Sequence, residues 1–217
     1  MSKARTSSIT SRKSRLVLVS GGADSAVLVA DALARSSRVT PLYIRSGLSW
    51  ETAELYWLKK FLRSLRSPKL NKLAVLDITA RDLYGKHWSV TRRRVPGAAT
   101  RDAAVYLPGR NVLLFSKAAV YAAMRDITEI ETGILKSNPF GDASEAFLKG
   151  FSANLSRALS KKIVIRAPFR HLTKREVLKR GRGLELQLTF SCIRPQGVKP
   201  CGRCNKCAER KKALLTL

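Results

Sequence analysis

Residues 20–25 read Ser-Gly-Gly-Ala-Asp-Ser and have the composition of a phosphate-binding loop. They follow Leu-Val-Leu-Val at 16–19, an unbroken aliphatic run typical of a buried parallel strand. Glycines let a backbone approach an anion closely, and the free amides of a helix that begins here favour negative charge. Ser20 and Ser25 add hydroxyl donors, and Asp24 or Ser25 suits the cap of the helix that follows. Asp24 could also help to hold Mg²⁺. The candidate phosphate-contacting residues are Val19, Ser20, Gly21, Gly22, Ala23, Asp24 and Ser25.

All four cysteines lie after residue 190, at the spacing C-x8-C-x2-C-x2-C. Four thiolates so spaced suit one tetrahedral Zn²⁺, and such a zinc is structural because it keeps no open position. Neighbouring lysines and arginines would help to keep the thiolates ionised. An iron–sulfur cluster and a redox thiol pair are the alternatives. The candidate metal ligands are Cys192, Cys201, Cys204 and Cys207.

The composition is strongly basic. The chain carries 42 Lys and Arg against 15 Asp and Glu, and its net charge of +27 suggests polyanionic partners such as nucleic acid, nucleotide phosphates or acidic lipid. A solvated basic surface is the simpler interpretation, because the charges are spread along the chain. The 45% hydrophobic content argues against disorder. No apolar run approaches the roughly 18 residues needed to cross a bilayer, so we expect no membrane span and a cytoplasmic protein.

Aliphatic runs and helix-forming stretches alternate along most of the chain. Strands are predicted at residues 16–19, 39–44, 73–78, within 126–135, and at 162–165. Helices are predicted at residues 24–35, 50–65, 111–125, 143–159 and 173–180. Strands that alternate with helices pair in parallel, so the sequence predicts an α/β fold with a doubly wound, Rossmann-like parallel sheet. Ligands bind such sheets at the carboxyl ends of the strands, where residues 20–25 lie.

Two segments fall outside this alternation. Residues 79–110 include Arg92-Arg93-Arg94, and a stretch of this length suggests a mobile flap beside the site or, alternatively, a decorative insertion. Residues 1–14 are basic, rich in Ser and Thr and free of acids, which indicates a flexible terminus or, alternatively, a transit peptide. We therefore expect an α/β domain at 15–185 and a zinc-binding segment at 186–217.

Residues 20–25 resemble the pyrophosphate loop of the adenine nucleotide α-hydrolase-like enzymes, or PP-loop ATP pyrophosphatases, which cleave ATP between the α- and β-phosphates. Other stretches point to one family within that group. The sequence around the cysteines, Leu-Pro-Gly-Arg-Asn-Val-Leu at 107–113, and Thr-Lys-Arg-Glu at 173–176 are similar to segments of the 7-cyano-7-deazaguanine synthases. The resemblance runs from about residue 15 to residue 214, with the motifs in the same order.

The resemblance implies an ATP-dependent carbon–nitrogen ligase of queuosine biosynthesis. Members of that family activate 7-carboxy-7-deazaguanine with ATP, capture ammonia to form an amide, and dehydrate the amide to a nitrile. It implies ATP and Mg²⁺ at the loop, Zn²⁺ on the cysteines, and a homodimer. Arg110 is expected to pair with a phosphate or the substrate carboxylate, and Asn111 to help bind the nucleotide. The residues expected to act in catalysis are Asp24, Ser25, Arg110 and Lys174.

One stretch departs from the family pattern. Where the substrate loop of the family typically reads Tyr-Pro-Asp-Cys-Arg, residues 138–144 read Asn-Pro-Phe-Gly-Asp-Ala-Ser. Asp142 is kept, but Ala143 and Ser144 stand at the Cys and Arg positions, so a specificity element is lost. Two other hypotheses therefore stay open. One keeps the ATP chemistry with a different acceptor, such as a tRNA base, and the other is a non-catalytic basic zinc module that binds a nucleotide.

Overall fold

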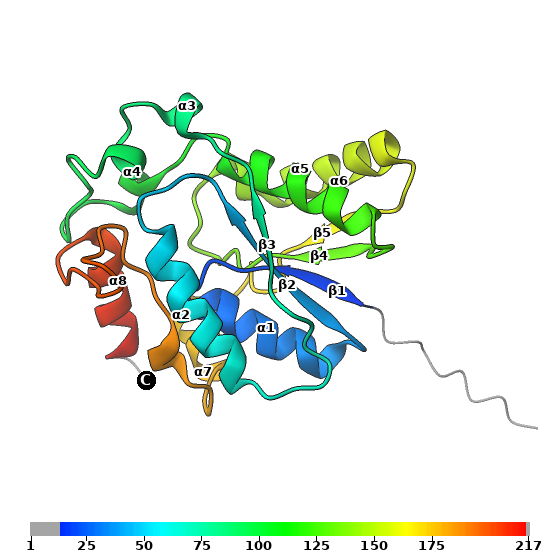
Figure 1. The fold of residues 1–217 in the computed structure, drawn as a ribbon, viewed down its shortest axis with the longest axis horizontal. Coiled ribbons are helices and arrows are strands. Elements are labelled where there is room, and N and C mark those ends of the chain that lie inside the picture. Colours follow the sequence, from blue (N-terminus) through cyan, green and yellow to red (C-terminus); the bar gives the residue numbers. More distant parts are fainter. Residues whose placement is uncertain (1–13, 216–217) are drawn as a thin grey trace, which may run out of the picture.

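Five aliphatic segments form a parallel sheet in the computed structural model, which describes residues 14–215 (Figure 1). The strands are β1 Arg15–Leu18, β2 Val39–Arg45, β3 Ala74–Asp77, β4 Glu129–Glu131 and β5 Val164–Arg166. Their order is β3-β2-β1-β4-β5, and every neighbouring pair is parallel. The doubly wound sheet that the alternation predicts is confirmed. The segment expected to be flexible, residues 1–14, lies outside the described residues except for Ser14.

Helices cover both faces of the sheet (Figure 1). The main helices are α1 Ala23–Arg35, α2 Glu51–Ser64, α5 Arg110–Ala123, α6 Glu145–Leu159 and α7 Lys174–Arg180. Helices α1, α2 and α7 share one core, which contains Val27, Phe61 and Val177. Helices α5 and α6 cover the other face, where Phe115 and Leu148 are buried. No helix within residues 14–215 is both long enough and apolar enough to span a membrane.

A third hydrophobic cluster joins residues 79–110 to the chain around the cysteines. Its secondary structure comprises α3 Arg81–Tyr84, α4 Trp88–Thr91, a 3₁₀ turn at Asp102–Val105 and α8 Asn205–Leu214. Trp50, Leu107 and Phe190 are buried together in this cluster. The sequence pattern predicted none of these helices, because α3 and α4 are single turns and α8 has few apolar residues to mark a period.

The predicted elements between residues 15 and 180 are all present, with ends that differ by one or two residues. Strand β1 is central, since it pairs with β2 on one side and with β4 on the other. The chain winds from β1 across α1 to β2 on one side, and later reaches β4 through α5 on the opposite face. The carboxyl end of β1 is therefore the topological switch point, where a parallel sheet opens a crevice for ligands.

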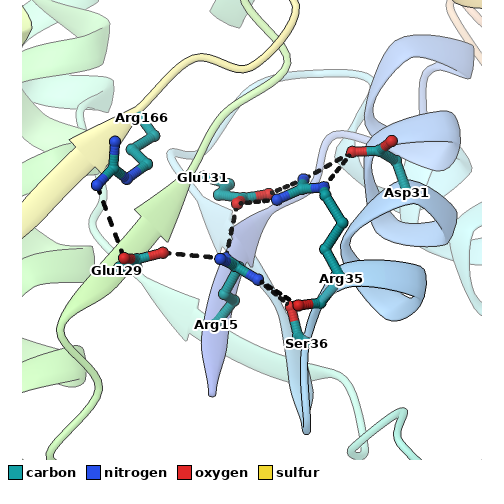
Figure 2. A network of polar contacts seen from close by, with 7 residues as sticks. All are labelled: Arg15, Asp31, Arg35, Ser36, Glu129, Glu131 and Arg166. Atoms are coloured by element: carbon teal, nitrogen blue, oxygen red, sulfur yellow. Dashed lines mark hydrogen bonds and ion pairs between the residues drawn. The ribbon is translucent and has the colours of Figure 1, made fainter. Parts of the chain in front are cut away.

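A buried carboxylate links β1, β4 and α1 (Figure 2). Glu131 of β4 is fully buried, and its Oε1 lies 2.9 Å from Nε of Arg15. Arg35 of α1 donates to both of its oxygens, at 3.2 and 3.1 Å. Arg15 also donates to Glu129 at 3.0 Å, and Arg35 lies 2.6 Å from Asp31. Two cations thus surround one carboxylate that has almost no access to water.

Replacing Glu131 with glutamine is expected to lower the free energy of unfolding by about 3 kcal/mol, because two arginines would lose their shared buried counter-charge. The effect falls at the low end for a buried pair, since 39% of the Arg35 side chain is exposed. Urea unfolding, followed by circular dichroism, measures the change. Asp77→Asn is the matched control, because that side chain is 78% exposed and should cost less than about 1 kcal/mol. Equal losses in the two variants would contradict the role of burial.

Candidate active site

The phosphate loop, residues 20–25, turns sharply between β1 and α1. Gly21 has a φ of +77°, and a Cβ at this position would lie 3.0 Å from the carbonyl oxygen of Glu54. Ser25 closes the loop, since its hydroxyl donates to the Gly22 carbonyl at 2.9 Å and accepts from the Ser20 amide at 3.3 Å. The N-cap of α1 is Gly22 without a side-chain cap, so the expectation that Asp24 or Ser25 caps this helix is wrong. Ser25 instead holds the loop shut.

Asp24 occupies the first turn of α1 with two unequal oxygens. Its Oδ2 lies 2.5 Å from Nζ of Lys174, the first residue of α7. Its Oδ1 is buried and has no hydrogen-bond partner among the described residues. Burial raises the pKa of Asp24, and the nearby Lys174 works against that rise. An unpartnered carboxylate oxygen beside a phosphate loop is the donor that a divalent cation takes.

Lys174 connects the phosphate loop to the C-terminal helix. Its ammonium group lies 3.7 Å from a carboxylate oxygen of Glu209 in α8, besides its contact with Asp24. Thr173 and Glu176 form a capping box that fixes the start of α7. The side chain of Lys174 is therefore held at the loop by its own helix, although it is 150 residues from Asp24 in sequence.

Two pockets meet at the phosphate loop, and both are lined by Ser20, Asp24 and Arg110. The first, which we call the tryptophan pocket, has a volume of about 230 Å³. Its walls include Trp50, Glu54, Trp88, Leu107, Lys174 and Phe190. The second, which we call the strand-end pocket, has a volume of about 190 Å³. Its walls include Val19, Ser25, Tyr43, Asn111, Phe115, Gly133 and Asn138.

Arg110 and Asn111 begin α5 at the junction of these pockets. Gly109, with a φ of +68°, directs the chain into the helix, and Arg110 lines both pockets. The Nε of Arg110 is buried without a partner among the described residues. Asn111 donates from its backbone and its side chain to the Asp142 carboxylate, each at 3.2 Å. Arg110, which the sequence predicted as a site residue, thus lines the same pockets as the phosphate loop, and its Nε–H group has no partner among the described residues.

The four cysteines converge, as their spacing predicts. Their sulfur atoms all lie within 4.8 Å of one another. The sulfurs of Cys192 and Cys204 are 3.9 Å apart, and those of Cys201 and Cys207 are 4.0 Å apart. Zinc–sulfur bonds of about 2.3 Å in a tetrahedron place sulfurs about 3.8 Å apart, so the arrangement fits one metal ion. Two backbone amides also point at Cys192 Sγ, each at 3.3 Å, which supports a thiolate there.

The phosphate loop, the convergent cysteines and the residues that begin α5 and α7 all lie within one family match. The family model described as "Queuosine biosynthesis protein QueC" matches residues 14–217. This chain belongs to the QueC family. It is 30% identical to "7-cyano-7-deazaguanine synthase 1" of Desulfitobacterium hafniense, over 93% of this chain and 92% of that protein. It is 28% identical to the "7-cyano-7-deazaguanine synthase" of Methanocaldococcus jannaschii, over 92% of this chain and 94% of that protein.

A solved structure supports the fold assignment. The crystal structure of a 4-thiouridine synthetase–RNA complex with bound ATP matches with a TM-score of 0.50 and 18% sequence identity. The match covers 94% of this chain and 50% of that one. The match supports the α/β fold of this QueC chain. The family resemblance read from the motifs is confirmed by the family model.

In this QueC chain, residues 79–110 are attached to the cysteine cluster. Gly97 pairs with Cys204 in an antiparallel bridge. The amide of Asn205 donates to the Pro96 carbonyl at 3.0 Å, and its side chain donates to the Thr100 carbonyl at 2.8 Å. Trp88 of the same segment stacks on Trp50 in the tryptophan pocket, with ring centroids 5.6 Å apart. The candidate metal ligands therefore anchor one wall of the candidate site, and the mobility expected of this segment stays a prediction.

The residues that depart from the family pattern lie outside both pockets. Ser144 caps α6, since its hydroxyl accepts from the Phe147 amide at 3.2 Å. Ala143 is buried among the residues packed below α5 and α6. Neither side chain lines the tryptophan pocket or the strand-end pocket. Their roles in this structure are packing and capping.

Sequence reasoning missed Glu54, which the structure places in the tryptophan pocket. Glu54 lies on the stripe of α2 that buries Leu58 and Phe61, where an acidic residue breaks the apolar period. An acidic residue at an otherwise apolar position of the helix was the signal in the sequence that could have identified Glu54. Its carboxylate accepts a hydrogen bond from the Tyr43 hydroxyl at 2.7 Å.

Proposed function

We propose that this chain is an ATP-dependent carbon–nitrogen ligase that converts 7-carboxy-7-deazaguanine and ammonia to 7-cyano-7-deazaguanine. The observation that carries the proposal is the Asp24–Lys174 pair at the point where the two pockets meet. A nucleotide and an acceptor held in the two pockets would meet there, beside an unpartnered carboxylate oxygen and an ammonium group. Membership in the QueC family and the names of the relatives support this choice of substrate.

The phosphate loop suits the triphosphate of ATP. The amides at the start of α1 favour an anion at the loop, and Gly21 supplies the positive-φ turn, packed against the Glu54 carbonyl, that leads from β1 into this helix. Asp24 Oδ1 would hold Mg²⁺, which supplies charge neutralisation on the phosphate oxygens. Lys174 and Arg110 would contact phosphate oxygens or the acceptor carboxylate as charged donors. These assignments concern the residues that bind and orient ATP.

The metal at Cys192, Cys201, Cys204 and Cys207 would be Zn²⁺ in a structural role. All four ligand positions of a tetrahedral ion are filled by sulfur, which leaves none for a substrate. The segment expected to bind it, residues 186–217, also supplies Phe190 and Glu209 to the tryptophan pocket. Its contribution to the reaction is therefore the shape of that pocket.

The chemistry needs positioning and charge stabilisation more than a covalent intermediate on the protein. A carboxylate oxygen of the acceptor attacks the α-phosphorus of ATP, and pyrophosphate leaves. Ammonia then attacks the activated carbon, and AMP leaves to give the amide. A second adenylation, on the amide oxygen, is followed by loss of AMP and formation of the nitrile. Holding the two reactants within contact distance contributes most of the acceleration in such steps.

The assay that tests this function follows pyrophosphate release with ATP, Mg²⁺, ammonium and 7-carboxy-7-deazaguanine, and reads the product mass in the same tube. The expected product is the nitrile, which would show that Ala143 and Ser144 are tolerated. Tight ATP binding without turnover would contradict the choice of acceptor. Because the net charge of +27 favours an anionic partner, tRNA would then be the acceptor to test, with an affinity that falls as salt rises.

A further inference from the structure

Glu54 is a buried glutamate that lines the tryptophan pocket beside the phosphate loop. Its backbone carbonyl faces Gly21, at 3.0 Å from the position where a Cβ would stand. Only 7% of the residue is exposed, yet it contributes to the pocket lining together with Asp24 and Arg110. Burying a carboxylate to this extent costs free energy unless the group is paired or hydrogen-bonded.

The surroundings of Glu54 shift the pKa of its carboxyl group to near neutral pH, so that the charged and the neutral form are both accessible. Burial raises the pKa of Glu54 to about 7, while Arg110 and the hydrogen bonds from Tyr43 and Trp50 favour the charged form. Glu51, a neighbour on α2, raises the pKa further through like-charge repulsion. No salt bridge to Glu54 occurs within residues 14–215. A group with such a pKa can take up and release a proton near neutral pH.

The other carboxylates that line the tryptophan pocket are paired with lysines. Asp24 is paired with Lys174, and its second oxygen is the proposed cation ligand. Burial would raise the pKa of Glu209, but Lys206 and Lys174 outweigh it and leave that pKa lowered. Arg210 donates to Thr189 and is a permanent cation. Among the described residues that line this pocket, Glu54 is thus the carboxylate without a cationic partner in contact.

We propose that Glu54 is the proton acceptor for the nitrogen nucleophile. The assignment rests on the proposed function, in which ammonia attacks an acyl adenylate. Attack forms the C–N bond and breaks the C–O bond to AMP, which leaves with the electron pair of that bond. The nitrogen then carries three hydrogens and a positive charge, and it passes one proton to the Glu54 carboxylate. The products are the amide, AMP and a protonated Glu54, which returns its proton to solvent.

The same group serves the dehydration. Transfer of AMP to the amide oxygen gives an adenylated, positively charged amide with two hydrogens on nitrogen, and pyrophosphate leaves. Both protons must depart as the carbon–oxygen bond to AMP breaks and the nitrile forms. Glu54 accepts one of them and, once it has released that proton, the other. Both nitrogen steps therefore shed protons in a pocket where this one carboxylate can receive them.

The experiment compares the wild-type protein with Glu54→Gln and measures adenylation and nitrogen transfer separately. ATP–pyrophosphate exchange, run with 7-carboxy-7-deazaguanine and without ammonium, needs only the first half-reaction. Amide formation in a single turnover, at a constant concentration of free ammonia, needs the proton acceptor. We expect exchange within about threefold of wild type and amide formation lowered by about a hundredfold or more. Glutamine keeps the shape of the side chain and can still accept from Tyr43.

The pH dependence gives a readout that a purely structural role would not move. In wild type, the pH profile of amide formation should have an acidic limb near pH 7, below which the rate falls, because a protonated Glu54 cannot accept a proton. Tyr43→Phe removes a hydrogen bond to the carboxylate and should move the limb to higher pH. Glu51→Gln removes a like charge and should move it to lower pH. In Glu51→Gln, a change outside both pockets, exchange should keep its wild-type pH profile.

Three results would overturn the assignment. Amide formation by Glu54→Gln at the wild-type rate would show that another group takes the proton. Loss of exchange together with amide formation would show that Glu54 only supports the loop. A limb that neither Tyr43→Phe nor Glu51→Gln moves would mean that it belongs to another group. By contrast, a wild-type protein that shows no exchange with this acceptor would refute the proposed function itself, before any variant is compared.

Discussion

Replacing Asp24 with asparagine is expected to lower pyrophosphate release by at least about a thousandfold, because it would weaken the binding of the proposed Mg²⁺, and a bound cation stabilises the charge of the transition state by several kcal/mol. Asparagine keeps the shape of the side chain, so Lys174 can still donate to it. It removes the negative charge from Oδ1, the buried oxygen that has no partner among the described residues. The measurement is the rate of pyrophosphate release at saturating ATP, over a range of Mg²⁺ concentrations.

Asp31→Asn is the matched control for this prediction. Asp31 lies on the same helix, two turns further along, where it accepts from Arg35 at 2.8 Å and lines neither pocket at the phosphate loop. Its replacement should leave the rate unchanged. A rate for Asp24→Asn equal to that of wild type at every Mg²⁺ concentration would show that Asp24 holds no cation. Partial recovery at high Mg²⁺ would support the assignment, because a weakened ligand set needs more metal.

Local chemistry explains why so much of this site could be predicted. The phosphate loop is continuous in sequence, and its two glycines become diagnostic in combination with the polar residues around them and the aliphatic strand that precedes them. The cysteines are also close in sequence, so their spacing alone brings the sulfurs within reach of one ion. The parallel pairing of the strands follows from the alternation of elements, since parallel strands need a crossover connection such as a helix.

What the sequence could not show depends on contacts between distant segments. Lys174 meets Asp24 across 150 residues, and only the packing of α7 against α1 brings them together. The cap of α1 was mispredicted because the helix begins at Ala23, one residue before the polar pair, so that its N-cap is Gly22, which has no side chain to cap with. Glu54 was overlooked because its partner Tyr43 comes from β2, a strand that reads as purely structural.

The attachment of residues 79–110 to the cysteines changes the interpretation of the zinc segment. A metal ion bound by four cysteines far from a reaction centre would stabilise only the C-terminal segment. Here Cys204 pairs with Gly97, and Asn205 donates to carbonyls on both sides of that bridge. Trp88, which completes the tryptophan pocket, belongs to the same attached segment. The four cysteines, and a metal ion bound by them, would thus support a wall of the candidate active site.

Removal of the metal is expected to release that wall and abolish turnover. The free energy of binding a structural zinc, about 10–16 kcal/mol, is folding free energy of the segment that it organises. Without the ion, four sulfur atoms that lie within 4.8 Å of one another lose the bonds that hold them together. The bridge to Gly97 and the contacts of Asn205 should then open, whereas the sheet, with its own core on each face, should stay folded.

Limited trypsin digestion measures this opening directly, because residues 92–94 are three consecutive arginines. After treatment with a chelator, cleavage there should be at least about tenfold faster, with the far-ultraviolet circular dichroism of the sheet largely retained. Asn205→Ala separates the two contributions, since it removes the side-chain bond to the flap but none of the ligands. It should keep one metal ion per chain by mass spectrometry and show an intermediate cleavage rate. Cleavage that is equally slow with and without metal would contradict the attachment of the wall to the cysteine centre.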